Sequence, residues 1–146
     1  MQLHDAETYT VEEIPDEDSF YYRIHKTKID FDEPDPKKKI KLLAFDPQSK
    51  IKNEISTEMS TDWSRYSSTI DSQNRARIPN DNGIVSFLVS LVKDTPYSLS
   101  VRHDPVHEIP KNLSHSLVFD VPARKNDIGI RLKLRDICNW EIPIEE

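Results

Sequence analysis

Apolar and polar residues alternate along several stretches of the chain, as they do in a strand with one buried face. In residues 20–29 the alternation puts Phe20, Tyr22 and Ile24 on one face, and residues 128–135 show the most regular alternation. The pattern predicts strands at 20–29, 40–45, 97–103, 115–121 and 128–135, and residues 136–143 are expected to close the fold.

Two stretches depart from this alternation. Residues 84–92 carry apolar side chains at helical spacing, which favours an amphipathic helix, although their β-branched content leaves a strand as the alternative. Residues 46–82 are weakly patterned, with a helical turn or two expected around 51–60, and long stretches of this kind are often functional. Together the patterns predict a single α+β domain on a largely antiparallel sheet of about six strands with one or two helices.

The N-terminal residues 1–18 are acidic and contain few large apolar side chains, so we expect a flexible or loosely docked acidic arm before a domain spanning 19–146. Residues 1–20 hold seven acidic side chains and no Lys or Arg, whereas the whole chain has a net charge of −6. The rest of the chain therefore sums to +1. A nearly neutral domain lacks the positive field that favours duplex nucleic acid, so we expect no such partner.

Scarce glycine and cysteine exclude several classes of protein. The two glycines, Gly83 and Gly129, are too far apart to build a phosphate-binding loop or a dinucleotide fingerprint. The lone Cys138 cannot form an internal disulfide or a cysteine-rich zinc site. No apolar run approaches the roughly 20 residues that span a bilayer, and the N-terminus shows no signal-peptide pattern. We therefore expect a cytoplasmic protein with no membrane segment and no cofactor.

Trp63, Arg65 and Tyr66 lie together among serine and threonine residues in the weakly patterned stretch. Aromatic and arginine side chains are enriched where proteins bind one another, so these three residues are candidates for a partner-binding surface. The alternative is that Trp63 and Tyr66 fold back and anchor a long loop to the core.

Three of the five histidines fall within residues 103–115, between two predicted strands. If these strands are antiparallel neighbours, alternation brings His103 and His115 to the same end of the sheet on its inward face. With Asp104 and Asn112 beside them, the two imidazoles are candidate catalytic groups for acid–base chemistry on a phosphoester or glycosidic bond. A metal site is a weaker alternative because the spacing matches no standard zinc signature. A third interpretation is that the histidines are structural and bond to backbone carbonyls at the strand ends.

Arg23 and His25 share one face of the first predicted strand. Together with Arg65 and the two histidines, they could form a cationic pocket for the phosphate or carboxylate group of a ligand. The alternative is that Arg23 and His25 are only solvated.

The sequence favours a small cytoplasmic interaction module, such as an accessory subunit, regulator or inhibitor. It would bind a protein partner through the acidic arm and the aromatic–arginine loop. The alternative is an enzyme or ligand-binding protein that uses the histidine cluster on a phosphate- or nucleotide-bearing substrate. Whether the protein is an enzyme, and in which oligomeric state it works, stays open at the level of sequence.

Overall fold

The computed structural model describes residues 10–46, 58–94, 97–121 and 128–145. These residues form a single six-stranded sheet in the order β4-β5-β2-β1-β3-β6, in which every neighbouring pair is antiparallel. The strands are β1 (Ser19–His25), β2 (Met59–Trp63), β3 (Asn82–Leu88), β4 (Ser100–His103), β5 (His115–Phe119) and β6 (Asn139–Ile142). The predicted α+β fold on an antiparallel sheet is confirmed.

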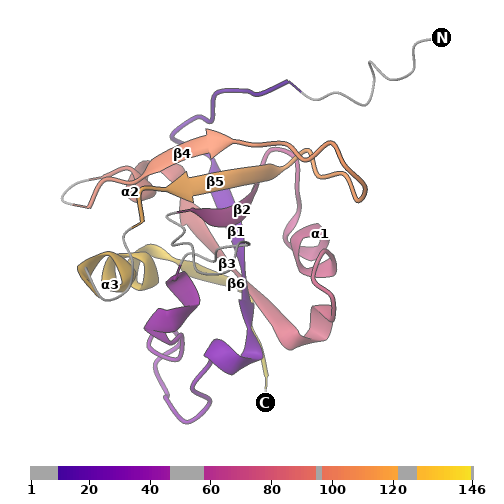
Figure 1. Ribbon diagram of the computed structural model, residues 1–146. Coiled ribbons are helices and arrows are strands. Elements are labelled where there is room, and N and C mark those ends of the chain that lie inside the picture. Colours follow the sequence, from indigo (N-terminus) through magenta and orange to yellow (C-terminus); the bar gives the residue numbers. More distant parts are fainter. Residues whose placement is uncertain (1–9, 47–57, 95–96, 122–127, 146) are drawn as a thin grey trace, which may run out of the picture.

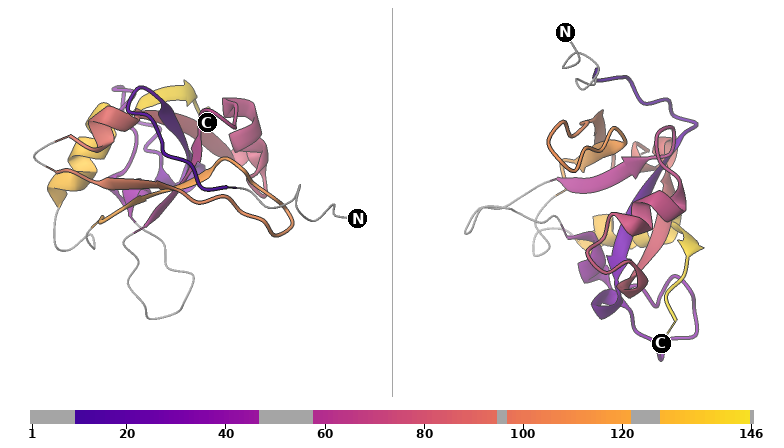
Figure 2. Two further views of the ribbon diagram at one scale, coloured as in Figure 1. Left: turned by 90° about the horizontal axis from the view of Figure 1, so that it is seen from above. Right: turned by 90° about the vertical axis from the view of Figure 1, so that its right-hand side faces the viewer.

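Helices lie on both sides of this sheet. One side carries α1 (Thr69–Asn74), and the other carries α2 (Val89–Val92) and α3 (Ile128–Ile137), as Figures 1 and 2 show. The described residues also form three short 3-10 helices, η2 (Lys26–Lys28), η3 (Leu42–Phe45) and η4 (Pro79–Asp81). Within the described ranges, none of the helices combines the length and apolar character needed to cross a membrane.

The core lies on the side of the sheet that faces α2 and α3. Phe20 on β1 pairs with both Trp63 on β2 and Phe87 on β3, so the three aromatic side chains point to this side, and all three are fully buried. Tyr22 stacks on Phe45 of η3 at 6.1 Å between ring centroids. Burial of apolar side chains is the dominant favourable contribution to folding, and aromatic rings bury the largest area per residue.

Residues 84–92 form mainly a strand, so the predicted helix is wrong. The five residues 83–87 of β3 are all buried, because this strand lies inside the sheet and is covered on both faces. A strand buried on both faces reads as a continuous apolar run and is hard to distinguish from a helix. Only Val89–Val92 continue as the short helix α2.

Residues 128–135, the most regular alternation in the chain, are helical, so the predicted strand is also wrong. In α3 the buried residues are Ile130, Arg131 and Leu134, which share one helix face. The alternating Ile128 and Leu132 are instead 59% and 44% exposed. The buried Arg131 donates from Nε to Asp46 at 2.5 Å, so a charged residue occupies the inward face that the alternation assigned to apolar residues.

Of the remaining predicted elements, some are confirmed and others are wrong. The strands predicted at 20–29, 97–103 and 115–121 correspond to β1, β4 and β5, and β6 lies within 136–143. The strand predicted at 40–45 is wrong, because Leu42–Phe45 form η3. The helical turn expected at 51–60 lies mostly outside the described residues, and residues 59 and 60 belong to β2. The pattern did not reveal β2 or α1.

Residues 10–18 of the acidic arm are docked on the domain. Ile14 is only 6% exposed, and the backbone N–H of Glu12 donates to Nδ1 of His103 at 3.0 Å. The indole N–H of Trp63 donates to the carboxylate of Asp18 at 2.9 Å. This part of the arm therefore contributes to the core.

Replacing Ile14 by Ala is expected to lower the free energy of unfolding by about 2 kcal/mol, because it empties a buried apolar site. Val11 provides a matched control in the same segment because it is 61% exposed, and Val11→Ala should change stability by less than about 0.5 kcal/mol. Urea denaturation of both variants measures the difference. Equal effects would mean that the arm does not dock in this way.

Candidate ligand-binding site

A buried carboxylate, that of Asp62 on β2, lies on the sheet face that α1 covers. Its side chain is 3% exposed, and its Oδ2 accepts from the hydroxyl of Ser72 at 2.6 Å. The same oxygen forms ion pairs with Arg75 at 3.1 Å and with Arg23 at 3.2 Å. Ser72 in α1 and Arg75 at its C-cap are three residues apart, so the helix presents both on one side.

The second oxygen of this carboxylate is also satisfied. Oδ1 of Asp62 accepts from the amide of Asn112 at 2.9 Å and from the hydroxyl of Ser114 at 3.2 Å. Asn112 and Ser114 belong to the segment between β4 and β5 and also bond to each other. Asn112, predicted to tune the histidines, therefore acts on a different group. Asp62 connects α1, β1 and the β4–β5 loop.

Burial alone disfavours the ionised form of Asp62, but its surroundings outweigh burial. Hydrogen bonds from Ser72 and Asn112, and the charges of Arg23 and Arg75, hold the pKa of the Asp62 carboxyl group below its usual value. The carboxylate is therefore ionised at neutral pH and fixes both guanidinium groups.

Each of the two guanidinium groups is held through a single nitrogen. Nη1 of Arg23 also donates to the carbonyl of Ser72 at 3.1 Å, and Nη1 of Arg75 also donates to the hydroxyl of Ser67 at 2.8 Å. Among the described residues, the other nitrogens of both groups have no hydrogen-bond partner. Because they are held in place and keep unused donors, both arginines are prepared to bind an anion.

An open groove of about 540 Å³ lies beside these arginines, and we call it the arginine groove. It contains three guanidinium groups and one carboxylate, in a chain whose net charge is −6. Its lining residues are Arg23, His25, Arg75, Ala76, Arg77, Ile78, Asp81 and Asn82.

Two further cationic or basic groups of the groove are exposed. Arg77 makes no ion pair or side-chain hydrogen bond within the part of the chain that the structure describes. Nδ1 of His25 lies 3.0 Å from the hydroxyl of Thr27 and accepts from the Thr27 N–H at 3.2 Å. Both contacts use Nδ1, so Nε2 of this exposed side chain is available to a ligand. The structure thus brings together Arg23 and His25, two of the three predicted ligand-binding residues.

The third predicted ligand-binding residue, Arg65, lies elsewhere. Its guanidinium group lies 5.8 Å from the ring centroid of Trp63 and 5.5 Å from that of Tyr66, and Arg65 does not line the arginine groove. Trp63, predicted to contact a partner, is fully buried, and the ring of Tyr66 packs against it at 5.3 Å. The alternative interpretation, in which these aromatic residues anchor a loop to the core, describes their placement.

His103 is a buried structural histidine at the end of β4, 1% exposed. Its Nδ1 accepts from the N–H of Glu12, so the ring proton lies on Nε2, which donates to the carbonyl of Leu113 at 2.7 Å. The ring also packs against Trp63 and Tyr66 at 5.0 and 6.0 Å. Both nitrogens are occupied, which leaves no free position for acid–base chemistry.

His115 lies on the opposite face of the sheet, so the predicted shared site of the two histidines is wrong. The pairing register places His103 opposite Ser116, and the neighbouring His115 therefore points to the other side. Its Nδ1 lies 2.8 Å from the carbonyl oxygen and 3.3 Å from the carboxylate of Asp104. This pairing orients a single imidazole, which does not line the arginine groove. Acid–base catalysis by His115 and Asp104 stays a prediction.

The sequence did not single out Asp62, the residue that organises the site. A single aspartate among polar residues carries no local sign of burial, because its partners Arg23, Arg75 and Asn112 are distant in sequence. The arginines at 75 and 77 were the available signal, since both follow directly after a short polar helix.

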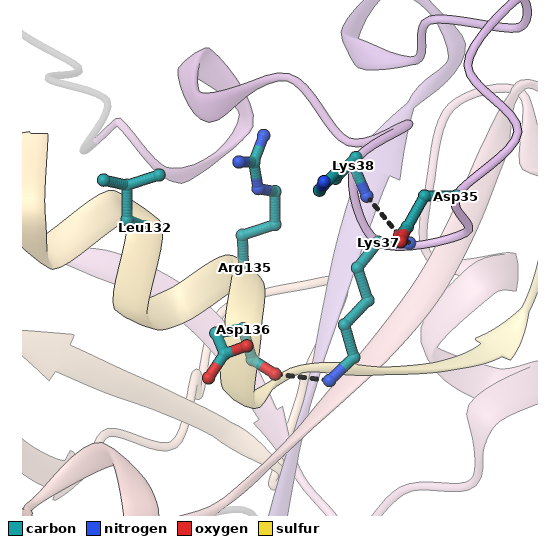
Figure 3. A pocket seen from close by; sticks show the side chains of 6 residues that line it. All are labelled: Asp35, Lys37, Lys38, Leu132, Arg135 and Asp136. Carbon is teal, nitrogen blue, oxygen red and sulfur yellow. Dashed lines mark hydrogen bonds between the residues drawn. The ribbon is translucent and has the colours of Figure 1, made fainter.

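A second basic pocket, of about 380 Å³, lies between residues 35–38 and α3. Figure 3 shows Lys37 reaching across to the end of α3, where its ammonium group donates to the backbone carbonyl of Asp136. Asp35 accepts the N–H groups of Lys38 and Lys37, and the pKa of its carboxyl group is lowered chiefly by the first of these bonds. Lys37 thus acts as a cap for α3, since a cation favours a helix C-terminus.

Among the described residues, no group of three or more His, Cys, Asp or Glu side chains is arranged to hold a metal ion. Comparison of the chain with protein-family models, with curated proteins and with solved structures returns no match.

Proposed function

We propose that the protein binds a phosphate-bearing small molecule in the arginine groove. The observation that carries this proposal is the pair Arg23 and Arg75, which the buried Asp62 fixes at ion-pair distance while their remaining nitrogens stay without partners among the described residues. Arg77 adds a third guanidinium group to the same groove. Guanidinium groups match the geometry of phosphate oxygens, and prior fixation lowers the entropy lost on binding.

The charge balance of the groove favours phosphate over a single carboxylate. The lining holds three arginines and the carboxylate of Asp81, which already pairs with Lys26 at 3.1 Å. The buried Asp62 balances one of the three positive charges, so the arginines still carry more charge than one carboxylate can neutralise. A phosphate group carries more negative charge and more acceptor oxygens than a carboxylate, so it can engage several guanidinium groups at once.

This proposal takes the place of the interaction module as the best-supported function. A protein partner bound through the aromatic–arginine loop would need Trp63 at the surface, whereas Trp63 is fully buried and bonded to Asp18. Arg65 is the exposed member of that loop. A cytoplasmic location forms part of the proposal and is supported by the lone, buried cysteine.

Replacing Arg77 by Gln should weaken binding of pyrophosphate and of phosphate monoesters by about tenfold, with little change in stability, because Arg77 is exposed and makes no internal bond among the described residues. Isothermal titration calorimetry at low salt measures the affinity. Arg102→Gln is the matched control, since Arg102 on β4 is also exposed but lies over the ring of Phe119 on β5, outside the arginine groove.

The expected pattern is loss of affinity in Arg77→Gln and unchanged affinity in Arg102→Gln. A protein that binds none of these probes, or two variants that weaken binding equally, would contradict the proposal. Added salt should weaken binding further because the contact is ionic.

A further inference from the structure

The arginine groove is larger than a phosphate group requires. Its volume of about 540 Å³ falls within the range of roughly 300–1,000 Å³ that is typical of pockets for complete small molecules. The part of the groove that the arginines do not line is formed by His25, Ala76, Ile78, Asp81 and Asn82. A ligand that fills the groove therefore carries a body beyond its phosphate.

Asp81 supplies the one carboxylate of the lining, at the end of η4. Its Oδ1 lies 3.1 Å from the ammonium group of Lys26, and its side chain is 25% exposed. A carboxylate repels phosphate and accepts hydrogen bonds from hydroxyl groups, and acidic residues hold ribose hydroxyls in this way in dinucleotide-binding folds. The groove therefore has a phosphate end at its arginines and a hydroxyl-binding position at Asp81.

The same groove offers apolar and planar surface for a ring. Ile78 is 53% exposed although it is a large apolar residue, and Ala76 lies beside it. The exposed imidazole of His25 is oriented by its bonds to Thr27. Flat side chains of this kind stack on nucleobases, which present a π-face whatever their identity.

We infer that the ligand of the arginine groove is a ribonucleotide. Its phosphate binds Arg23, Arg75 and Arg77. Its ribose hydroxyls donate to Asp81, and its base lies against His25 and Ile78. This inference rests on the proposed binding of a phosphate-bearing molecule and adds the sugar and the base to it.

The test compares ligands that differ by one part at a time, by isothermal titration calorimetry on the full chain. The probes are pyrophosphate, ribose 5-phosphate, the four ribonucleoside 5′-monophosphates and their 2′-deoxy forms. The best ribonucleotide should bind at least about tenfold more tightly than ribose 5-phosphate, and several-fold more tightly than its deoxy form, since each lost contact removes a hydrogen bond or stacking surface.

Three variants assign the contacts. Asp81→Asn should remove the preference for ribose over deoxyribose, while Lys26→Gln, which breaks the same ion pair but keeps the carboxylate, should retain it. His25→Ala should weaken binding of the best ribonucleotide but leave ribose 5-phosphate unchanged. Unfolding curves of all three variants confirm that they are folded.

The outcomes separate the two proposals. If no phosphate-bearing probe binds, both the proposed function and this inference fail. If pyrophosphate or ribose 5-phosphate binds as tightly as the best ribonucleotide, the proposed function stands and the inference is overturned. An unchanged preference for ribose in Asp81→Asn would also overturn it.

Discussion

Asp62→Asn is expected to lower the free energy of unfolding at pH 7 by about 3 kcal/mol, because it removes the charge that pairs with Arg23 and Arg75. Asparagine also replaces one of the two acceptor oxygens by an NH2 group, so the donor that now bonds to that oxygen, either Ser72 at Oδ2 or Asn112 at Oδ1, meets another donor. The loss of stability should lie at the low end of the range for a broken buried ion pair. The side chains of Arg23 and Arg75 are 35% and 29% exposed, so water can solvate their charges in the variant. Urea denaturation measures this loss.

The contribution of Asp62 should also depend on pH. Its pKa is lower in the folded protein than in the unfolded chain, so the stabilisation is fully present above the unfolded pKa of about 3.9 and is lost as the pH falls through the folded pKa. The difference in stability between the native protein and Asp62→Asn should therefore shrink as the pH falls below about 4. Unfolding curves recorded between neutral and acidic pH measure this trend.

Asp32→Asn is the matched control, because Asp32 is an exposed aspartate in the loop after η2. Its replacement should change stability by less than about 0.5 kcal/mol at any pH. A loss at Asp62 that matches the one at Asp32, or that stays constant in acid, would mean that the carboxylate does not organise the site.

His103→Leu is expected to cost about 2–3 kcal/mol of folding stability. Leucine keeps much of the apolar packing, but the N–H of Glu12 and the carbonyl of Leu113 lose the partner that the buried imidazole gives them. Hydrogen exchange should show faster exchange at the Glu12 amide, and denaturant unfolding measures the stability.

His115→Leu is the comparison for this prediction, since it makes the same change on the opposite face of the sheet. It should cost about 1 kcal/mol or less, because the side chain of Asp104 is 48% exposed and can bond to water instead. Equal losses in the two variants, or an unchanged Glu12 amide in His103→Leu, would contradict the placement of His103 as the anchor of the arm.

The local pattern of apolar and polar residues was sufficient to locate an element that has one buried and one polar face. The alternation at 20–29 and 97–103 located β1 and β4, because such a strand repeats every two residues whatever it packs against. The stretch 115–121 also contains the predicted strand, β5, although residues 116–118 are all buried. Patterning failed for β3, which is buried on both faces. It also failed for α3, whose inward face includes the charged Arg131 paired with Asp46.

The candidate site depended still more on contacts between distant residues. Arg23 and His25 were recognised as a cationic pair on one strand face, since alternation alone places them together. Their neighbours Arg75 and Arg77 come from the end of a helix about fifty residues later, and only the packing of α1 on the sheet brings them to the same groove.

The sequence by itself determined the class of fold, the acidic composition of residues 1–20 and the absence of glycine-rich phosphate loops, because composition and short-range periodicity are properties of the chain alone. Only the tertiary structure decided the faces of His103 and His115, since a shift of one residue in strand register turns every side chain to the other side. It also decided the role of Asp62, because the burial and the ionisation of a carboxylate are set by the partners that folding brings to it.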